Sequence, residues 1–232
     1  VTGEMLGDYY HSRFGVDTRS VRFPGLISNV TLPGGGTTDY AVEIYYEAIR
    51  SGRFTCPVPG DVYMDMMYMP DALRACVELM EADPTKLVHR NSFNIASMSF
   101  TPEIIYAEIK KRLPDFTMDY DVDPVKKAIA ESWPNSLDDT CAREEWGWKP
   151  EWDLSSMTDD MLEEESEIVS RNPLRELCGD PVGESGGVVS ADSREARTGS
   201  TTIVDTSESW DGTALPSYPA GTPRITILRI TI

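Results

Sequence analysis

The sequence predicts an α/β fold. Over the first 162 residues, strand-like stretches alternate with amphipathic helical stretches, and the loops between them are short. The chain has 232 residues, enough for one ordinary domain with an extension or for two small domains. From residue 163 onward, Gly, Ser, Thr, Pro and charged residues dominate. We therefore expect an α/β body at 1–162 and a low-complexity, disordered tail at 163–232.

The body begins with an expected helix over residues 1–14. Its large apolar side chains share one face, and Gly15 suits the left-handed position after the last turn. A strand is expected over 16–23, in which apolar positions alternate with the polar positions Arg19 and Arg22.

The stretch from Thr18 to Arg50 organises the rest of the chain. After the strand come a break, a glycine turn at 34–36 and a helix expected over 40–49, whose start carries two hydroxyls and a carboxylate. This arrangement is typical of a ligand contact, because backbone approaches closely where side chains are absent. The alternative is a solvent loop followed by an ordinary N-cap, since Thr and Asp favour that position for capping alone. Neither a G-x-G-x-x-G nor a G-x-x-x-x-G-K-[ST] phosphate motif occurs in this turn.

Later elements alternate in the same way. Strands are expected over 53–58, 64–69, 91–96 and 116–120. Helices are expected over 71–81, 101–113, 123–132 and 136–147. The apolar stripe of the 71–81 helix is read as Leu73, Cys76, Val77 and Met80. The methionines at 66, 67 and 69 and the tryptophans at 133, 146 and 148 are interpreted as packing residues.

Charge excludes two classes of partner. The formal net charge is −18, whereas nucleic acids and anionic membrane surfaces require a basic footprint. No apolar run approaches the length of a membrane span, and the first residues show no signal-peptide pattern.

Cysteine and histidine are sparse. The four cysteines are scattered without a C-x-x-C pair, and neither His11 nor His89 has a Cys or a second His at ligand spacing. We therefore predict no metal site, and we expect reduced, buried thiols. No G-x-S-x-G motif occurs, and so few histidines make a Ser/His/acid set implausible.

The last eight residues, 225–232, alternate as a strand does. With no sheet predicted nearby in the sequence, we expect this end to be aggregation-prone rather than functional.

Six segments occur in order along 1–162: RFPGLIS at 22–28, PGGGTTDYA at 33–41, MMYM at 66–69, MSFTP at 98–102, SWP at 132–134 and AREEWGWK at 142–149. Together they resemble the L-threonine 3-dehydrogenases of the extended short-chain dehydrogenase/NAD-dependent epimerase superfamily. Several linked motifs at family spacing are far more specific than any one of them. The tail carries no such resemblance.

The resemblance implies the C-terminal part of an NAD-binding Rossmann-type dehydrogenase with its small substrate lobe. It implies NAD-dependent oxidation of the L-threonine hydroxyl to a ketone, giving 2-amino-3-ketobutyrate. The family's phosphate loop and its catalytic Tyr, Lys and Ser or Thr are expected upstream of Val1, so this fragment alone is expected to be inactive. A homodimer through helices such as 1–14 is also implied, in bacterial cytoplasm or in the mitochondrial matrix.

The resemblance also assigns site residues. Pro24, Gly25 and Leu26 match the segment that lies against the nicotinamide. Thr37, Thr38 and Asp39 match the positions that contact the amino-acid substrate. The Thr hydroxyls and helix-start N–H groups suit the substrate carboxylate, and Asp39 suits its ammonium.

Two alternatives stay open. One is a sugar-nucleotide epimerase or dehydratase of the same superfamily, which would need basic groups for its phosphates; residues 34–47 contain none. The other is a truncated product without catalytic activity.

Overall fold

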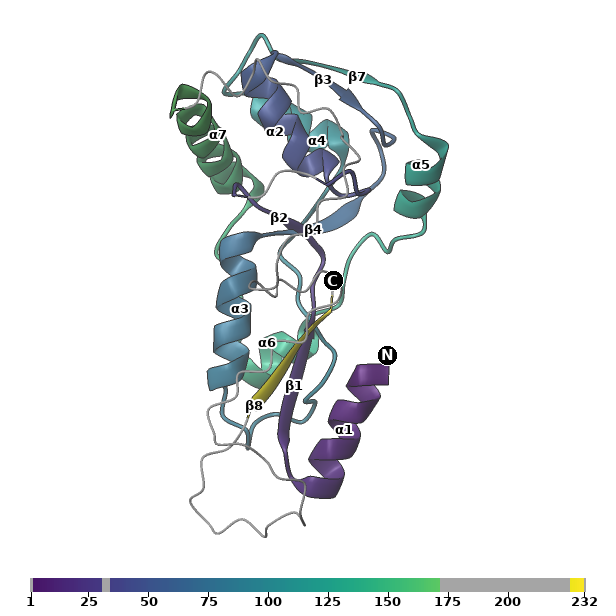
Figure 1. The fold of residues 1–232 in the computed structure, drawn as a ribbon, viewed down its shortest axis with the longest axis vertical. Coiled ribbons are helices and arrows are strands. Elements are labelled where there is room, and N and C mark those ends of the chain that lie inside the picture. The colour runs from purple at the N-terminus through teal and green to yellow at the C-terminus, as the bar shows by residue number, and fades with distance from the viewer. Residues whose placement is uncertain (1, 31–33, 172–225, 232) are drawn as a thin grey trace, which may run out of the picture.

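The computed structural model describes residues 2–30, 34–171 and 226–231 (Figure 1). The helices are α1 (Thr2–Phe14), α2 (Tyr40–Arg50), α3 (Met69–Glu81), α4 (Pro102–Lys110), α5 (Pro124–Glu131), α6 (Thr140–Trp146) and α7 (Leu154–Arg171). The strands are β1 (Asp17–Arg22), β2 (Gly25–Ile27), β3 (Arg53–Cys56), β4 (Met64–Tyr68), β5 (Phe93–Asn94), β6 (Met98–Phe100), β7 (Thr117–Tyr120) and β8 (Thr226–Thr231).

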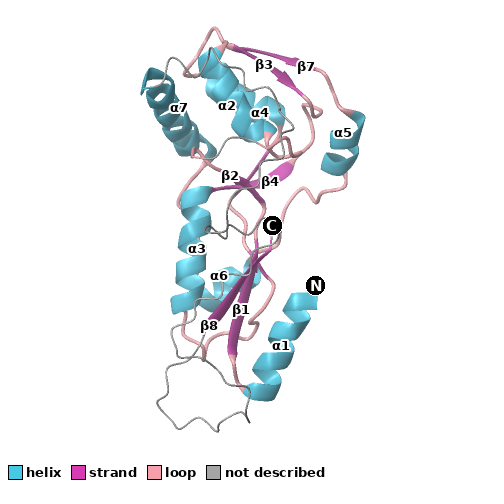
Figure 2. Ribbon diagram, viewed as in Figure 1, coloured by secondary structure: helices cyan, strands magenta, loops and turns pink. Residues whose placement is uncertain are grey.

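The strands of the described residues form three small sheets, in the orders β5-β1-β8, β2-β4-β6 and β3-β7. All pairings are parallel except β4 with β6. Parallel strands joined through helices are the signature of an α/β fold, so the predicted fold class is confirmed. Figure 2 shows β2 and β4 crossing the waist of an elongated molecule, between an upper lobe around α2, α4 and α7 and a lower lobe around β1, α3 and α6.

Strand β4 serves both lobes. Its neighbouring residues Met66 and Met67 are fully buried, and each belongs to a different core cluster. Successive side chains of a strand point to opposite faces, so Met66 packs with the α2 and α4 side and Met67 with the β1 and α3 side. The predicted packing role of these methionines is confirmed, and the two lobes share one continuous strand at the waist.

Most predicted elements are present within a few residues of their expected ends. Strands β2 and β6 were not predicted, because three residues are too few to show an alternating pattern. The α1 helix ends as expected: Gly15 has a φ of 70°, and its N–H donates to His11 O at 2.9 Å. No helix among the described residues is both long and apolar enough to cross a membrane.

The polar face predicted for β1 is wrong at Arg19, because Asp17 to Val21 are all buried, whereas Arg22 is exposed as expected. Arg19 is only 2% exposed. It pairs with Asp17 at 2.8 Å and donates to the carbonyls of Met80 and Ala82 at the C-terminal end of α3. A cation is stabilised at that end of a helix, where the last carbonyls lack intrahelical partners. Arg19 is therefore buried as a clamp between β1 and α3.

The face by which α3 packs was also predicted wrongly. Three of the four predicted stripe residues are exposed: Leu73, Val77 and Met80. The residues that pack inward are Asp71, Ala72, Ala75 and Leu79. The Asp71 carboxylate is buried because it accepts the backbone N–H groups of Glu151 and Trp152, each at 3.1 Å. These bonds, together with the contacts of Arg19, set how α3 is rotated about its own axis. They turn Asp71 inward and leave most of the apolar stripe predicted from the sequence facing solvent.

The tryptophans pack as predicted. Trp148 is buried, and its indole N–H donates to Ala96 O at 3.0 Å while the Arg74 guanidinium lies 4.9 Å from the ring centroid. Trp146 stands 5.7 Å from Trp148, centroid to centroid. The expectation of buried thiols is only partly met: Cys56 is buried, but Cys141 is exposed.

Two parts of the expected tail are ordered elements. Helix α7 continues past residue 162 to Arg171, and β8 pairs in parallel with β1, from Asp17 opposite Thr226 to Arg22 opposite Thr231. The terminal strand therefore does have a sheet to join, because the edge of β1 offers unpaired backbone groups. Residues 172–225, on which the remaining expectation of disorder falls, lie outside the described residues.

Candidate functional site

The two segments singled out in the sequence meet at the waist. Gly25 pairs with Met66 in the β2–β4 ladder. A Cβ atom at Gly25 would stand 2.5 Å from Met66 Sδ and 3.0 Å from Thr38 Cγ2. A side chain at position 25 would force Met66 Sδ to shift and would press on Thr38, so close packing favours glycine here. The start of β2 therefore lies directly against the loop that precedes α2.

Of the three residues expected to contact the cofactor, only one offers side-chain surface. Pro24 and Gly25 are buried, whereas Leu26 is half-buried and packs at the margin of the lower-lobe core. An apolar side chain in that position suits one wall of a nicotinamide site. The chain has no glycine-rich phosphate motif, so its residues fit the nicotinamide end of a dinucleotide but not the pyrophosphate.

The Asp39 side chain does not make the ordinary helix cap that the sequence left open. Asp39 occupies the N-cap position of α2 but makes no side-chain cap hydrogen bond. Its Oδ2 atom instead accepts the backbone N–H groups of Gly34 and Gly36, at 2.7 and 2.8 Å. The carboxylate thus points back along the chain and holds the glycine turn through Oδ2. Its other oxygen, Oδ1, receives no hydrogen bond within the described residues.

The N–H groups at the start of α2 are already used. Ala41 N donates to Thr38 O at 3.1 Å, and the N–H groups of Val42 and Glu43 both donate to Asp39 O. The expectation that these groups could receive a carboxylate is therefore wrong for these three residues, since the last turn of the loop satisfies them.

The loop lies in an acidic environment. Glu43, in the first turn of α2, is half-buried. Burial raises its pKa; the charge of Lys126 opposes this rise, and the neighbouring Asp39 charge adds to it. Asp39 and Glu43 thus bring two carboxyl groups to the start of α2, which favours a cationic ligand group over a phosphate.

A polar cluster beyond the end of β2 was missed from the sequence. Tyr68, fully buried at the end of β4, donates its hydroxyl to Asp160 Oδ2 on α7, and Asn29 Nδ2 donates to the same oxygen at 3.4 Å. The Tyr68 ring stands edge-on to Trp152, with centroids 5.0 Å apart. These contacts tie β2 and β4 to α7. No sequence signal joins residues so far apart along the chain.

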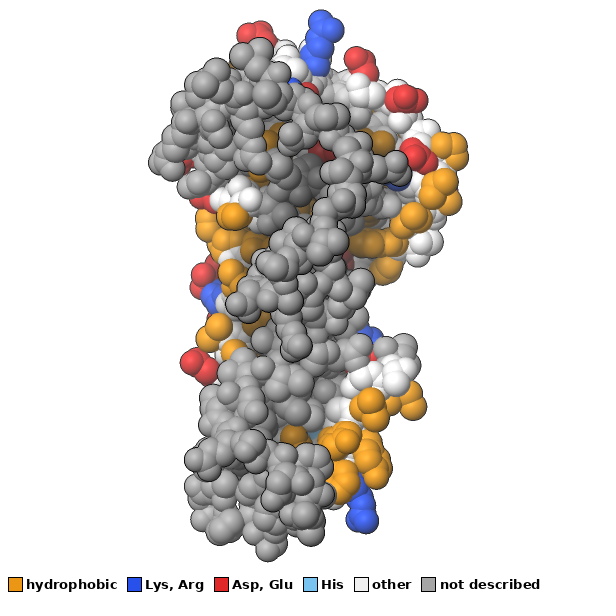
Figure 3. Space-filling model, viewed as in Figure 1, with side chains coloured by type: hydrophobic (Ala, Val, Ile, Leu, Met, Phe, Trp, Pro, Cys, Tyr) orange, Lys and Arg blue, Asp and Glu red, His pale blue; other side chains and the backbone are white. Residues whose placement is uncertain are grey.

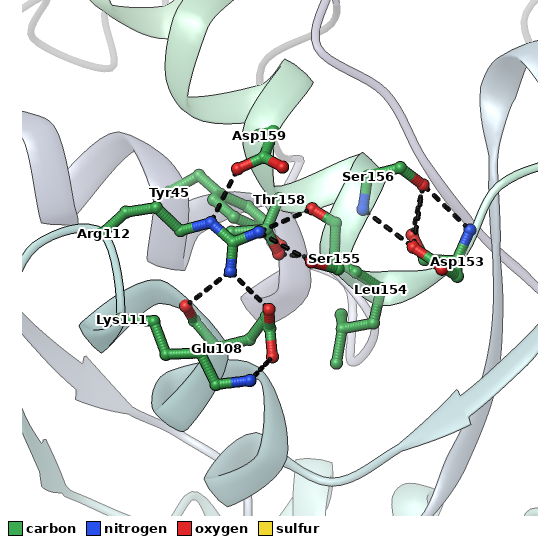
Figure 4. A network of polar contacts seen from close by, with 10 residues as sticks. All are labelled: Tyr45, Glu108, Lys111, Arg112, Asp153, Leu154, Ser155, Ser156, Thr158 and Asp159. Carbon is green, nitrogen blue, oxygen red and sulfur yellow. Dashed lines mark hydrogen bonds and ion pairs between the residues drawn. The ribbon is translucent and has the colours of Figure 1, made fainter.

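A second network holds α7 in place (Figure 4). Arg112, after α4, donates to Asp159 Oδ1 at 2.7 Å and to Ser155 Oγ at 2.8 Å, and it forms an ion pair with Glu108. A fork of donors reaching two helices is a geometry that only Arg provides. Arg112 thereby fixes α7 to α4, and α7 in turn contacts β4 at the waist through Asp160 and Tyr68.

The Tyr-x-x-x-Lys spacing does occur within this chain, at Tyr106 and Lys110. Both lie on α4, where Lys110 Nζ donates to the Tyr106 hydroxyl at 2.9 Å. The Tyr106 ring packs against Phe116, with centroids 5.5 Å apart. Helix α4 packs on α2 and α7 rather than on β2, so this pair belongs to the surface of the upper lobe.

Comparison with known proteins finds relatives among epimerase/dehydratases and L-threonine dehydrogenases. An uncharacterized epimerase/dehydratase of Staphylococcus haemolyticus is 61% identical over 162 residues, which are 70% of this chain and 51% of that protein. L-threonine dehydrogenase from Clostridium difficile is 62% identical with a TM-score of 0.70, covering 72% of this chain and 52% of that one. A GalE-like L-threonine dehydrogenase from Cupriavidus necator is 52% identical with a TM-score of 0.67, covering 70% and 58%. No family model matches. The chain thus spans about half the length of its relatives.

Proposed function

Because this chain belongs to the short-chain dehydrogenase/epimerase superfamily, we propose that it is the substrate-binding part of an NAD-dependent L-threonine 3-dehydrogenase. The observation that carries the proposal is the contact between Gly25 and Thr38. It puts the segment assigned to the nicotinamide beside the segment assigned to the amino acid, as a hydride transfer between them requires.

The loop supplies groups of the kind that an amino acid needs. The Thr37 and Thr38 hydroxyls are hydrogen-bond donors for the substrate carboxylate. Asp39, fixed through Oδ2 to the glycine turn, keeps Oδ1 for the substrate ammonium. Holding the zwitterion at both ends would aim its side-chain hydroxyl carbon at the cofactor side of the waist.

Leu26 would form an apolar wall against the nicotinamide, with Pro24 and Gly25 buried behind it. NAD, when bound, supplies the acceptor for the hydride that leaves the substrate carbon. We assign no proton transfer to the described residues of this chain. In the proposed enzyme that step belongs to the Tyr and Lys expected upstream.

The epimerase alternative draws on the names of the curated relatives, which are epimerase/dehydratases. A nucleotide-diphosphate sugar brings two phosphates, and the loop at 34–47 has no basic residue to receive them. The acidic pair Asp39 and Glu43 favours the ammonium of an amino acid instead. We therefore place L-threonine ahead of a sugar nucleotide.

A homodimer through α1 is part of the proposal. The apolar face of α1 is solvent-exposed and appears as a group of hydrophobic side chains at the lower right of Figure 3. It consists of Met5, Leu6, Tyr9, Tyr10 and Phe14, which are 43–66% exposed. Clustered exposed apolar residues of this kind mark an interaction surface.

A chimera tests the function. The first half of the Clostridium difficile enzyme would be joined to the whole of this chain. NAD reduction would be followed with L-threonine, and conversion of UDP-sugars would be followed by separating substrate from product. We expect threonine-dependent reduction, and none from this chain alone. A folded chimera that turns over a UDP-sugar but not L-threonine would refute the proposal.

A further inference from the structure

Three potential metal ligands meet in the lower lobe, away from the waist. His89 lies in the segment after α3, while Cys141 and Glu145 lie on α6. One ligand atom from each lies within 4.8 Å of the other two. Cys141 and Glu145 are one helical turn apart and so share a face of α6. Sequence spacing concealed the set, because His89 and Glu145 are 56 positions apart.

Glu145 is fixed before any ion arrives. Its side chain is only 9% exposed. Oε2 accepts the backbone N–H of His89 at 2.8 Å, and Oε1 is in contact with Nδ1 of the same histidine. A carboxylate held by a neighbouring N–H resembles the oriented ligands of metal sites, in which a further hydrogen bond sets the direction of the donor atom.

The other two ligands are free to adjust. The His89 side chain is 59% exposed, and Cys141 is exposed. Ligand atoms around a tetrahedral zinc ion lie about 3.5 Å apart, since Zn–N is about 2.0 Å and Zn–S about 2.3 Å. Rotation of an exposed imidazole and an exposed thiol closes the remaining gap without moving the buried carboxylate.

We propose that His89, Cys141 and Glu145 form a surface site for a zinc-class divalent ion. An imidazole, a thiolate and a carboxylate are a mixed nitrogen, sulfur and oxygen set that suits Zn²⁺ or Co²⁺, whereas Mg²⁺ and Ca²⁺ take oxygen ligands. Three protein ligands leave a fourth position for water. The bound ion would cross-link the segment after α3 to α6. This site is separate from the proposed substrate loop and does not depend on it.

The test is Co²⁺ titration of the metal-free full chain under a non-coordinating reductant. We expect a thiolate-to-cobalt charge-transfer band that saturates at one ion per chain and disappears when Zn²⁺ is added. Tryptophan fluorescence should fall in parallel, because Trp146 directly follows Glu145.

Cys141→Ser should abolish the band, and His89→Ala should weaken Co²⁺ binding at least about tenfold. Both side chains are exposed, so both variants should fold, which circular dichroism would verify. Cys76→Ser and His11→Gln are the matched controls, and Cys178→Ser is a further thiol control; these three should bind as the parent does. Absence of a saturable band, or its survival in Cys141→Ser, would overturn the proposal.

Discussion

Gly25 and Thr38 are in contact: a Cβ atom added to Gly25 would stand 3.0 Å from Thr38 Cγ2. Gly25 opens β2, and Thr38 lies in the loop before α2. The contact therefore joins the strand at the waist to the loop that we assign to the substrate. Any motion of the loop relative to β2 would have to change this close contact between Gly25 and Thr38.

We expect Gly25→Ala to destabilise the chain by about 1–3 kcal/mol, because the new methyl group overpacks the waist. Met66 Sδ, at the flexible end of its side chain, can move aside more easily than the branched Thr38. Urea unfolding measures the effect. Thr38→Ser removes the opposing methyl group, so the double variant should recover part of the loss; purely additive losses would show that Thr38 is not the obstacle.

The Glu4–Arg22 ion pair should make stability depend on acid pH. Hydrogen bonding with Arg22, opposed by burial, lowers the pKa of Glu4 to about 2. A depressed carboxyl pKa stabilises the fold above the ordinary pKa near 4.5 and loses that effect as the pH falls toward 2. Arg22 is 44% exposed, so solvent screening reduces the expected contribution to about 1 kcal/mol.

Glu4→Gln should therefore destabilise the chain at pH 7 and converge with the parent as the pH falls through about 2. Denaturant unfolding across this pH range measures the difference. Glu131→Gln, from an ion pair with both partners about half exposed, is the control and should differ little at any pH. A Glu4→Gln deficit that persists unchanged into acid would contradict the account.

The Arg112 fork should matter more than an ordinary surface charge. Arg112→Met removes bonds to Glu108, Ser155 and Asp159, and we expect a loss of about 2 kcal/mol. Arg112→Lys keeps the charge without the fork and should lose about half as much. Lys127→Met breaks an exposed pair 3.7 Å long and should cost less than about 0.5 kcal/mol. Equal losses for Arg112→Met and Lys127→Met would show that the fork is not important.

Local signals explain which parts of the fold the sequence could predict. Thr101 caps α4 by accepting Ile104 N at 3.3 Å, and Asp123 caps α5 by accepting Val125 N at 2.7 Å. Helix α7 could have been predicted too, because Asp153 and Ser156 bond reciprocally to each other's N–H groups in a capping pattern. Where a side chain forms a hydrogen bond with backbone only a few residues away, the sequence alone is enough to predict the helix end.

The errors lie where a partner is distant. Arg19 appeared to be a surface residue because its acceptors are about 60 positions away, at the end of α3. Asp71 is buried for the same kind of reason. At the candidate site, resemblance selected the two segments that the structure brings together. It could not show that Asp39 turns toward Gly34 and Gly36, because that choice depends on the path of the glycine turn.

The most direct test of the substrate assignment is Asp39→Asn in the chimeric enzyme, with Glu43→Gln as the matched loss of a nearby charge. Asparagine keeps the shape and one acceptor for the glycine turn, but it loses the charge that we assign to the substrate ammonium. A charge-assisted hydrogen bond contributes about 1.5–3 kcal/mol, so kcat/KM for L-threonine should fall roughly 10- to 150-fold while the Kd for NAD is unchanged. Near-normal kcat/KM in Asp39→Asn, or an equal fall in Glu43→Gln, would contradict the account.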